Sequence, residues 1–193
     1  MQIESIPSGL EIEELTTLGE LSKNDQKELC VIKGGYCDNL HAINFDQVKE
    51  TWYDEKLWHQ VKSCDALYIH GGIFYLIEFK TGEFVNIDRH RKIYDSIIGL
   101  IEHNLLSLDE CRRKVQYVMV EKKLEPSPAH FEFQRHLERS QSEPWEYEIS
   151  RRLISQWKKK PDIRKLTNFL FYKAYALSPS DFDAFARNRR WSD

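Results

Sequence analysis

The chain has 193 residues, a net charge of -3 and 41% hydrophobic residues, which is typical of a folded domain and unlike a disordered segment. No stretch approaches eighteen consecutive apolar residues, and the first residues lack the basic and apolar parts of a signal peptide, so we expect no membrane span and a cytoplasmic location. A chain of this length has room for one hydrophobic core, and we treat residues 1–193 as a single domain.

Charge is unevenly distributed along the chain. Residues 151–193 contain eleven Lys and Arg against four acids, a net charge of +7, which leaves -10 for the residues before them. A basic end on an acidic body favours a surface that binds polyanions, and a solvated basic face without a partner is the alternative. We define a basic C-terminal extension of about residues 145–193. Its candidate nucleic-acid-binding residues are Lys158, Lys159, Lys160, Arg164, Arg189 and Arg190.

Hydrophobic spacing predicts the elements of the first third of the chain. A short helical stretch is expected around Leu10–Leu21. Leu29–Lys33 is a strand candidate because it is a short apolar run that stops at two glycines. Phe45–Gln60 is predicted to be a helix, since its aromatic and apolar residues recur at helical spacing.

The period then changes to that of a sheet. Cys64–His70 and Ile73–Lys80 are two runs of apolar, β-branched and aromatic residues, separated by Gly71-Gly72. Two glycines between such runs predict a hairpin, because a two-residue turn of the favoured hand needs positive φ at both positions.

The second half predicts further helices and strands. Asp88–Leu106 is expected to be a long amphipathic helix, and Val115–Val120 a strand in the middle of the sheet because its run of residues is almost entirely apolar. Later expected elements are helices at His130–Arg139 and Ile149–Lys159, a strand within Asn168–Leu177 and a closing helix from Ser180 that Ser178-Pro179-Ser180-Asp181 caps. This order predicts a mixed α/β fold with a central mixed β-sheet and flanking helices.

The chemistry-bearing residues lie on the predicted hairpin. Counting outward from the glycines places Asp65 about opposite Glu78, and Glu78 and Lys80 share one face because they are two residues apart. Two carboxylates so close favour a hard divalent cation, and Mg²⁺ is the natural choice for oxygen ligands. Lys80 ends a largely apolar strand, where burying an unpaired ammonium is costly unless carboxylates lie beside it.

Asp65 is followed, after twelve intervening residues, by Glu78-Phe79-Lys80 at the end of an apolar strand. This pattern resembles the PD-(D/E)xK nuclease superfamily. The resemblance implies that Asp65, Glu78 and the Phe79 backbone carbonyl bind Mg²⁺ (or Mn²⁺) and that Lys80 assists hydrolysis. It also implies a restriction-endonuclease-like core, made of a helix, a three-stranded meander, a helix and a further strand, at about residues 45–122. The residue before Asp65 is Cys64, where the superfamily's name has proline.

The same resemblance implies auxiliary residues and partners. Asp46 and Glu50 are candidates for a further acid from the first core helix, while His90 and Tyr94 lie where the helix after the motif carries polar residues. The expected function is a Mg²⁺-dependent nuclease acting on DNA or RNA, in defence, restriction or repair. A homodimer or a protein partner is also compatible with this kind of enzyme.

Three other interpretations stay open. The hairpin could lie at the surface, with its charged residues joined by a cross-strand salt bridge. The chain could also keep the nuclease fold as a catalytically inactive binding or regulatory protein. A third candidate is a partner-binding protein that acts through its surface, for which a large exposed aromatic area would be the sign.

Overall fold

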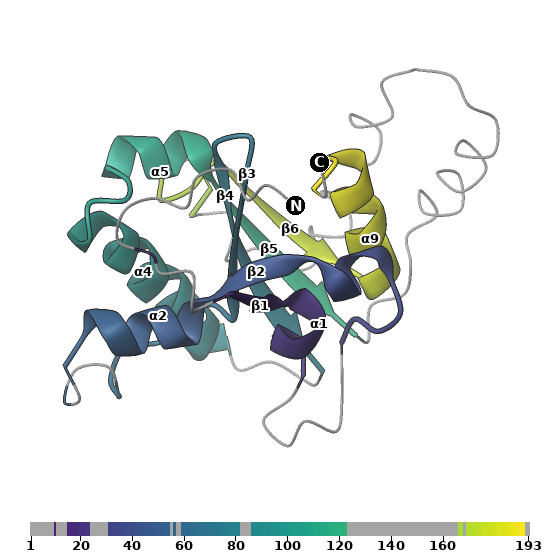
Figure 1. Cartoon of the computed structure of the whole chain (residues 1–193). Coiled ribbons are helices and arrows are strands. Elements are labelled where there is room, and N and C mark those ends of the chain that lie inside the picture. Colours follow the sequence, from purple (N-terminus) through teal and green to yellow (C-terminus); the bar gives the residue numbers. More distant parts are fainter. Residues whose placement is uncertain are drawn as a thin grey trace.

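The computed structural model of the chain contains one six-stranded mixed sheet with helices on both faces (Figure 1). The prediction of a mixed α/β fold with a central sheet and flanking helices is therefore confirmed. The structure describes residues 10, 15–23, 31–54, 56, 59–81, 86–122, 166–167 and 169–191, and for residues 86–89 the description is limited to the backbone.

The strands lie in the sheet in the order in which they occur along the chain. Strands β1 to β4 pair antiparallel, whereas β5 runs parallel to β4 and β6 runs parallel to β5. Parallel neighbours need a crossover connection, and two helices supply it between β4 and β5. The strands are β1 (Leu15–Thr17), β2 (His41–Asn44), β3 (Ala66–His70), β4 (Ile73–Lys80), β5 (Val115–Glu121) and β6 (Lys173–Leu177).

Helices cover both faces of the sheet. In Figure 1, α2, α4 and α5 lie on one side and α1 and α9 on the other. The helices whose bounds lie within the described residues are α1 (Leu18–Leu21), α2 (Phe45–Trp52), α4 (Asn86–Glu102), α5 (Leu108–Lys114) and α9 (Pro179–Asn188), together with the 3-10 helix η2 (Tyr36–Asn39).

Strand β4 divides the buried residues into two cores. Phe74 and Leu76 pack in the core that α4 covers, whereas Tyr75, Ile77 and Phe79 pack in the core that α9 covers. Successive residues of a strand point to opposite faces. The alternation therefore directs the side chains of Glu78 and Lys80 toward the face with α4.

The predicted hairpin is confirmed in its turn and register, but β3 begins at Ala66 rather than at the predicted Cys64. Ala66 pairs with Ile77 and His70 with Ile73 across β3 and β4. Gly71 and Gly72 have φ values of 56° and 70°, as a tight turn of the favoured hand requires. The predicted central strand is confirmed as well, because β5 lies between β4 and β6 and is buried along most of its length.

The N-terminal prediction is wrong in part. Of the expected helical stretch Leu10–Leu21, the last four residues form α1, whereas Leu15–Thr17 is a strand. The Thr17 side chain accepts a hydrogen bond from the Glu20 N–H, and this cap starts the helix at Leu18. Val31–Lys33 is not a strand: Val31 and Ile32 are buried and held by Ser22 in an irregular segment.

Helix α2 is shorter than the predicted Phe45–Gln60, because it ends at Trp52 and Tyr53 is extended. The Asp54 carboxylate accepts a hydrogen bond from the Lys56 N–H, and Lys56 is again helical, so this bond is of the kind that caps the start of a helix. The strand β2 just before α2 was not predicted, and its last residue, Asn44, caps this helix by accepting from the Gln47 N–H.

Later boundaries also differ from the predictions. Helix α4 ends at Glu102 because Asn104 adopts φ 56°, a left-handed conformation that terminates helices. The unpredicted α5 follows, and a reciprocal pair of hydrogen bonds between Ser107 and Glu110 starts it. Strand β6 occupies only the last part of Asn168–Leu177, and α9 begins at Pro179 with Ser178 as its cap. The helices expected at 130–139 and 149–159 lie outside the described residues.

The left-handed conformation of Gly72 in the turn predicts that two substitutions at this residue will lower the free energy of unfolding by different amounts. No atom lies within 4 Å of a Cβ built at this residue, so a side chain there meets a conformational cost rather than a clash. We expect Gly72→Val to lower the free energy of unfolding by about 1–2 kcal/mol, the cost of a left-handed L-residue. Gly72→Asn should cost less because Asn tolerates this conformation. Urea unfolding measures both, and equal losses would contradict the assigned turn.

Candidate active site

Asp65 and Glu78 face each other across the β3–β4 hairpin. The last register pair joins Ala66 to Ile77, so one further step outward places Asp65 opposite Glu78, as counting from the turn predicts. The Phe79 N–H donates a hydrogen bond of 2.6 Å to Asp65 Oδ2. This bond holds one Asp65 oxygen against the backbone of β4 and fixes the separation of the two acids.

Lys80 joins this pair from the same strand. Its Nζ lies 2.5 Å from Glu78 Oε1, and 30% of its side chain is exposed against 1% for Glu78. The three residues that the sequence selected, Asp65, Glu78 and Lys80, therefore lie together beneath α4. The interpretation of a hairpin whose charges face water does not fit Glu78, which is buried.

Sequence reasoning missed a fourth member, Lys92. Its Nζ lies 2.9 Å from Asp65 Oδ1 and 2.9 and 3.1 Å from the two oxygens of Glu78. Lys92 precedes Ile93, which belongs to the buried stripe of α4. A basic residue at the border of the apolar stripe of an amphipathic helix was the signal that could have identified it.

Burial and neighbouring charges shift the pKa values of Glu78 and Lys92. Burial raises the pKa of Glu78 to about 7, and the Asp65 carboxylate adds to the rise, while Lys92 and Lys80 oppose it. Burial lowers the pKa of Lys92, but the charges of Asp65 and Glu78 outweigh burial and hold that pKa above its ordinary value. Lys92 is therefore a permanent cation between two acids.

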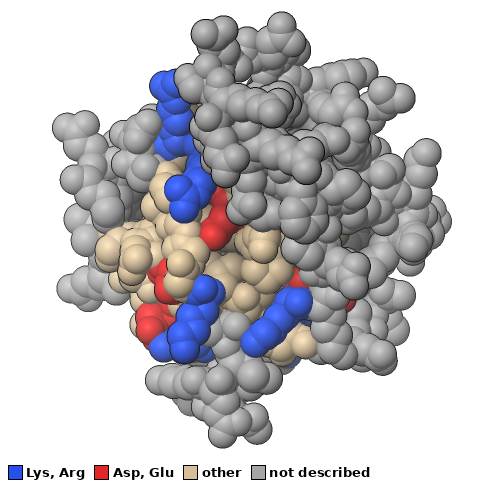
Figure 2. All heavy atoms as spheres, turned by 90° about the vertical axis from the view of Figure 1, so that its right-hand side faces the viewer, with Lys and Arg blue, Asp and Glu red and all other residues tan. Residues whose placement is uncertain are grey.

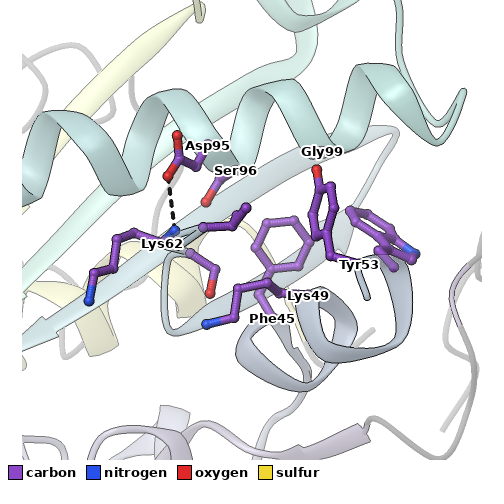
Figure 3. Close-up of a pocket in the computed structure, with 10 residues that line it drawn as sticks. Phe45, Lys49, Tyr53, Lys62, Asp95, Ser96 and Gly99 are labelled. Carbon is purple, nitrogen blue, oxygen red and sulfur yellow. Dashed lines mark hydrogen bonds between the residues drawn. The ribbon is translucent and has the colours of Figure 1, made fainter. Parts of the chain in front are cut away.

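Helix α4 is held over the hairpin by three contacts with the segment before Asp65. The Lys62 N–H donates to Asp95 and the Cys64 N–H donates to Ser96, both at 2.9 Å, and Arg91 donates to the Gln60 carbonyl. Figure 3 shows Asp95 and Ser96 pointing from the helix toward this segment. Since Lys92 lies one turn before Ser96, the same docking brings its ammonium to Asp65.

A pocket lies beside this docked segment, between α2 and α4 (Figure 3). It is a shallow hollow that is open to solvent, and Lys49, Trp52, Tyr53, Lys62 and Ser63 are among its lining residues. The Trp52 ring stacks on His103 at 4.3 Å and lies against Gly99, where a Cβ would come within 3.0 Å of it. Trp52 therefore serves helix packing. Asp65 and Glu78 do not line this pocket.

The auxiliary candidates have separate environments. Asp46 contacts Lys49 at 3.2 Å and the hydroxyl of Ser63, Glu50 is exposed and His90 is half-buried. Tyr94 is 38% exposed. Within the described ranges, no three His, Cys, Asp or Glu side chains form a group that could hold a metal ion. Asp46 and Glu50 thus do not complete a three-acid group with Asp65 and Glu78.

Of the basic candidates near the C-terminus, Arg189 and Arg190 lie within the described residues. The Arg189 guanidinium lies 3.6 Å from the centroid of the Phe185 ring, and Phe185 belongs to the core on the opposite face of the sheet from the Glu78 side chain. Arg190 is exposed. On the face in Figure 2, the described Lys and Arg side chains are interspersed with acids and form no continuous patch. Lys158, Lys159, Lys160 and Arg164 lie outside the described residues.

A scan against protein-family models, a search of curated proteins and a search of solved structures each find no match to this chain. In the part of the chain that the structure describes, no helix is long and apolar enough to cross a membrane. Inferences about function therefore depend on the geometry of Asp65, Glu78, Lys80 and Lys92.

Glu78→Gln should change the pH dependence of stability of the metal-free protein. The pKa of Glu78 is about 7 when folded, above its ordinary value of 4.5. Its protonated form therefore stabilises the fold fully below about pH 4.5, and this contribution is lost as the pH rises through about 7. In EDTA, the melting temperature of the wild type should fall relative to Glu78→Gln between about pH 5 and pH 8.

Glu110→Gln provides the control for this measurement. Lys114 and Ser107 lower the pKa of Glu110 to about 2, so Glu110 stays ionised throughout that pH range. Its difference from the wild type should be constant there. A constant difference for Glu78→Gln as well would contradict the raised pKa of Glu78.

Proposed function

We propose that this chain is a divalent-metal-dependent phosphodiesterase that hydrolyses nucleic acid, with Asp65 and Glu78 as metal ligands. One observation carries the proposal: three oxygens of these two acids converge on a single cation, the Lys92 ammonium, at 2.9–3.1 Å. A position that carboxylate oxygens surround and that is largely shielded from water is suited to a positive ion. Hard oxygen donors favour Mg²⁺ or Mn²⁺ at such a position.

The donor set fits such an ion in chemistry and charge. Asp65 and Glu78 supply oxygens only, and the buried Glu78 carboxylate has a raised pKa that a nearby divalent cation would lower. Asp65 is oriented by the Phe79 N–H, so it is held in place before any ion binds. The PD-(D/E)xK resemblance implies the Phe79 carbonyl as a further ligand.

Each residue has a definite part in the proposed reaction. Asp65 and Glu78 hold the ion, which when bound polarises the phosphoryl oxygen and lowers the pKa of a coordinated water. Lys80 is anchored to Glu78 by its ammonium while part of its side chain reaches solvent, so it can orient the attacking water or stabilise charge on the phosphate. Water adds to phosphorus, one P–O ester bond breaks, and the leaving oxygen takes a proton.

The order of elements supports assignment to a restriction-endonuclease-like core. Helix α1, the antiparallel strands β2, β3 and β4, helix α4 and strand β5 occur along the chain in the succession that the PD-(D/E)xK resemblance implies. This succession begins at Leu18 rather than at about residue 45, and α2 and α5 are additional helices within it. Asp65 directly precedes β3 and Glu78 lies on β4, which agrees with the positions that the resemblance implies for the two acids.

The proposed substrate is DNA or RNA because a polyanion suits the basic extension of residues 145–193. Its charge of +7 over residues 151–193 provides contacts to backbone phosphates, which require positive charge and reach rather than base recognition. Lys158, Lys159, Lys160, Arg164 and the exposed Arg190 are the residues proposed for this role, within a cellular task of defence, restriction or repair.

A second candidate function rests on Lys92. Two carboxylates and two ammonium groups form a network in which the charges balance, and such a network can stabilise the fold without any metal. In that case the chain is a catalytically inactive binding or regulatory protein built on a nuclease-like frame. The two functions differ in a property that can be measured directly, namely metal-dependent cleavage.

Purified protein incubated with single- and double-stranded DNA and RNA tests the proposal, in Mg²⁺, Mn²⁺ or EDTA. We expect cleavage that requires the metal and falls about a hundredfold or more in Asp65→Asn and in Lys80→Ala, the usual loss for a residue that acts in the transition state. Gel electrophoresis of labelled substrates measures the rates.

Asp109→Asn is the matched control, because Asp109 is an exposed acid paired with Arg112 on α5. This variant should cleave at the rate of the wild type. Circular dichroism verifies that each variant is folded. A folded wild type that cleaves none of the substrates and releases no heat on titration with Mn²⁺ would refute the enzyme and favour the binding protein.

A further inference from the structure

We propose that Lys92 is a built-in cation that competes with the divalent metal, so that a metal binds only by displacing the Lys92 ammonium from Asp65 and Glu78. The inference rests on the proposed function in one respect, the role of these two acids as metal ligands. It adds a means by which the protein controls its own metal site.

The Lys92 ammonium uses the oxygens that a metal would need. It contacts Asp65 Oδ1 and both oxygens of Glu78. The remaining oxygen, Asp65 Oδ2, already accepts the Phe79 N–H. Every carboxylate oxygen of the pair therefore has a donor, and three of the four share the same one.

Two cations cannot occupy this position together. Mg²⁺ binds oxygen at about 2.0–2.1 Å, and the ammonium lies 2.9–3.1 Å from the same oxygens. Placing both within this space would bring like charges within a few ångströms of each other at a largely buried site, where their repulsion is strong. The two states, with Lys92 bound or with metal bound, thus exclude each other.

Of the Lys92 and Glu78 side chains, Lys92 is the more exposed and is the one that can move out of the site. Its side chain is 21% exposed, whereas that of Glu78 is 1% exposed. A long, flexible lysine at the rim can withdraw to water and recover its hydration, but a buried carboxylate on a central strand has no such exit. Lys80 also contacts Glu78 Oε1, so the acid keeps one cation during the exchange.

The resident ammonium also explains how the acids lie together without a metal. The Glu78 and Asp65 carboxylates repel each other, and burial opposes the charge of Glu78. Lys92 relieves both effects, and removing one partner of a buried ion pair is strongly destabilising. The competition therefore links metal affinity to stability: removal of Lys92 should weaken the metal-free fold and strengthen metal binding.

Calorimetric titration of Mn²⁺ and of Mg²⁺ into the wild type and Lys92→Met tests this link. Met keeps the length and apolar stem of the side chain and removes its charge. We expect Lys92→Met to bind Mn²⁺ at least about tenfold more tightly, or about 1.4 kcal/mol. Lys92→Met should also have a lower melting temperature than the wild type in EDTA. Addition of Mn²⁺ should raise the melting temperature of the variant by more than that of the wild type.

Lys114→Met is the matched control, since Lys114 forms an ion pair with Glu110 at 2.8 Å on α5. It should leave Mn²⁺ affinity unchanged. Equal or weaker Mn²⁺ binding by a folded Lys92→Met than by the wild type would overturn the inference while leaving the nuclease proposal intact. Tighter binding without cleavage by any variant would refute the nuclease and support the competition. No binding by either protein would refute both.

A measurement on the wild type covers the case in which Lys92→Met fails to fold. Limited acetylation followed by mass spectrometry reports the exposure of each lysine. Saturating Mn²⁺ should increase the acetylation rate of Lys92 several-fold, because the displaced ammonium enters solvent, and should leave the rate of Lys114 unchanged. A rate for Lys92 that stays the same or falls when Mn²⁺ is bound would overturn the inference.

Discussion

The buried carboxylate of Glu78 is the constraint on which the surrounding structure depends. An ionised acid that is 1% exposed needs cations and hydrogen-bond donors close by, or it loses its charge. Lys80 comes from its own strand and Lys92 from α4, so the strand and the helix must meet at one place. The close approach of Asp65 raises this demand, because it adds a second negative charge to the same site.

Two kinds of contact hold helix α4 so that its Lys92 ammonium lies beside the two acids. Ile93, Ile97 and Leu100 pack in the core above the sheet, which supplies the hydrophobic energy of docking. Asp95 and Ser96 accept hydrogen bonds from the backbone of residues 62–64, which determine the position of the helix along the hairpin. The apolar stripe alone would allow the helix to slide, and the polar contacts place the Lys92 ammonium against the acids.

The opposite face of the sheet has a different role. The Asp183 carboxylate of α9 accepts the N–H groups of Tyr36 and Cys37 at 3.0 and 2.9 Å, and so ties the C-terminal helix to η2. Arg187 and Arg189 lie over the rings of Tyr36 and Phe185. Basic residues that look available for phosphate in the sequence are thus partly engaged in packing on aromatic rings.

The sequence by itself determined the features that depend on near neighbours: the hairpin with its two glycines, the pairing of Asp65 with Glu78, the face shared by Glu78 and Lys80, the buried strand β5 and the cap of α9. Counting is sufficient for these because the side-chain period of a strand and the geometry of a tight turn are fixed. Only the tertiary structure decided that Lys92 lies between the acids and that Arg189 packs on the other side of the sheet. These outcomes depend on how α4 and α9 dock on the sheet, and docking is determined by contacts between residues far apart in the chain.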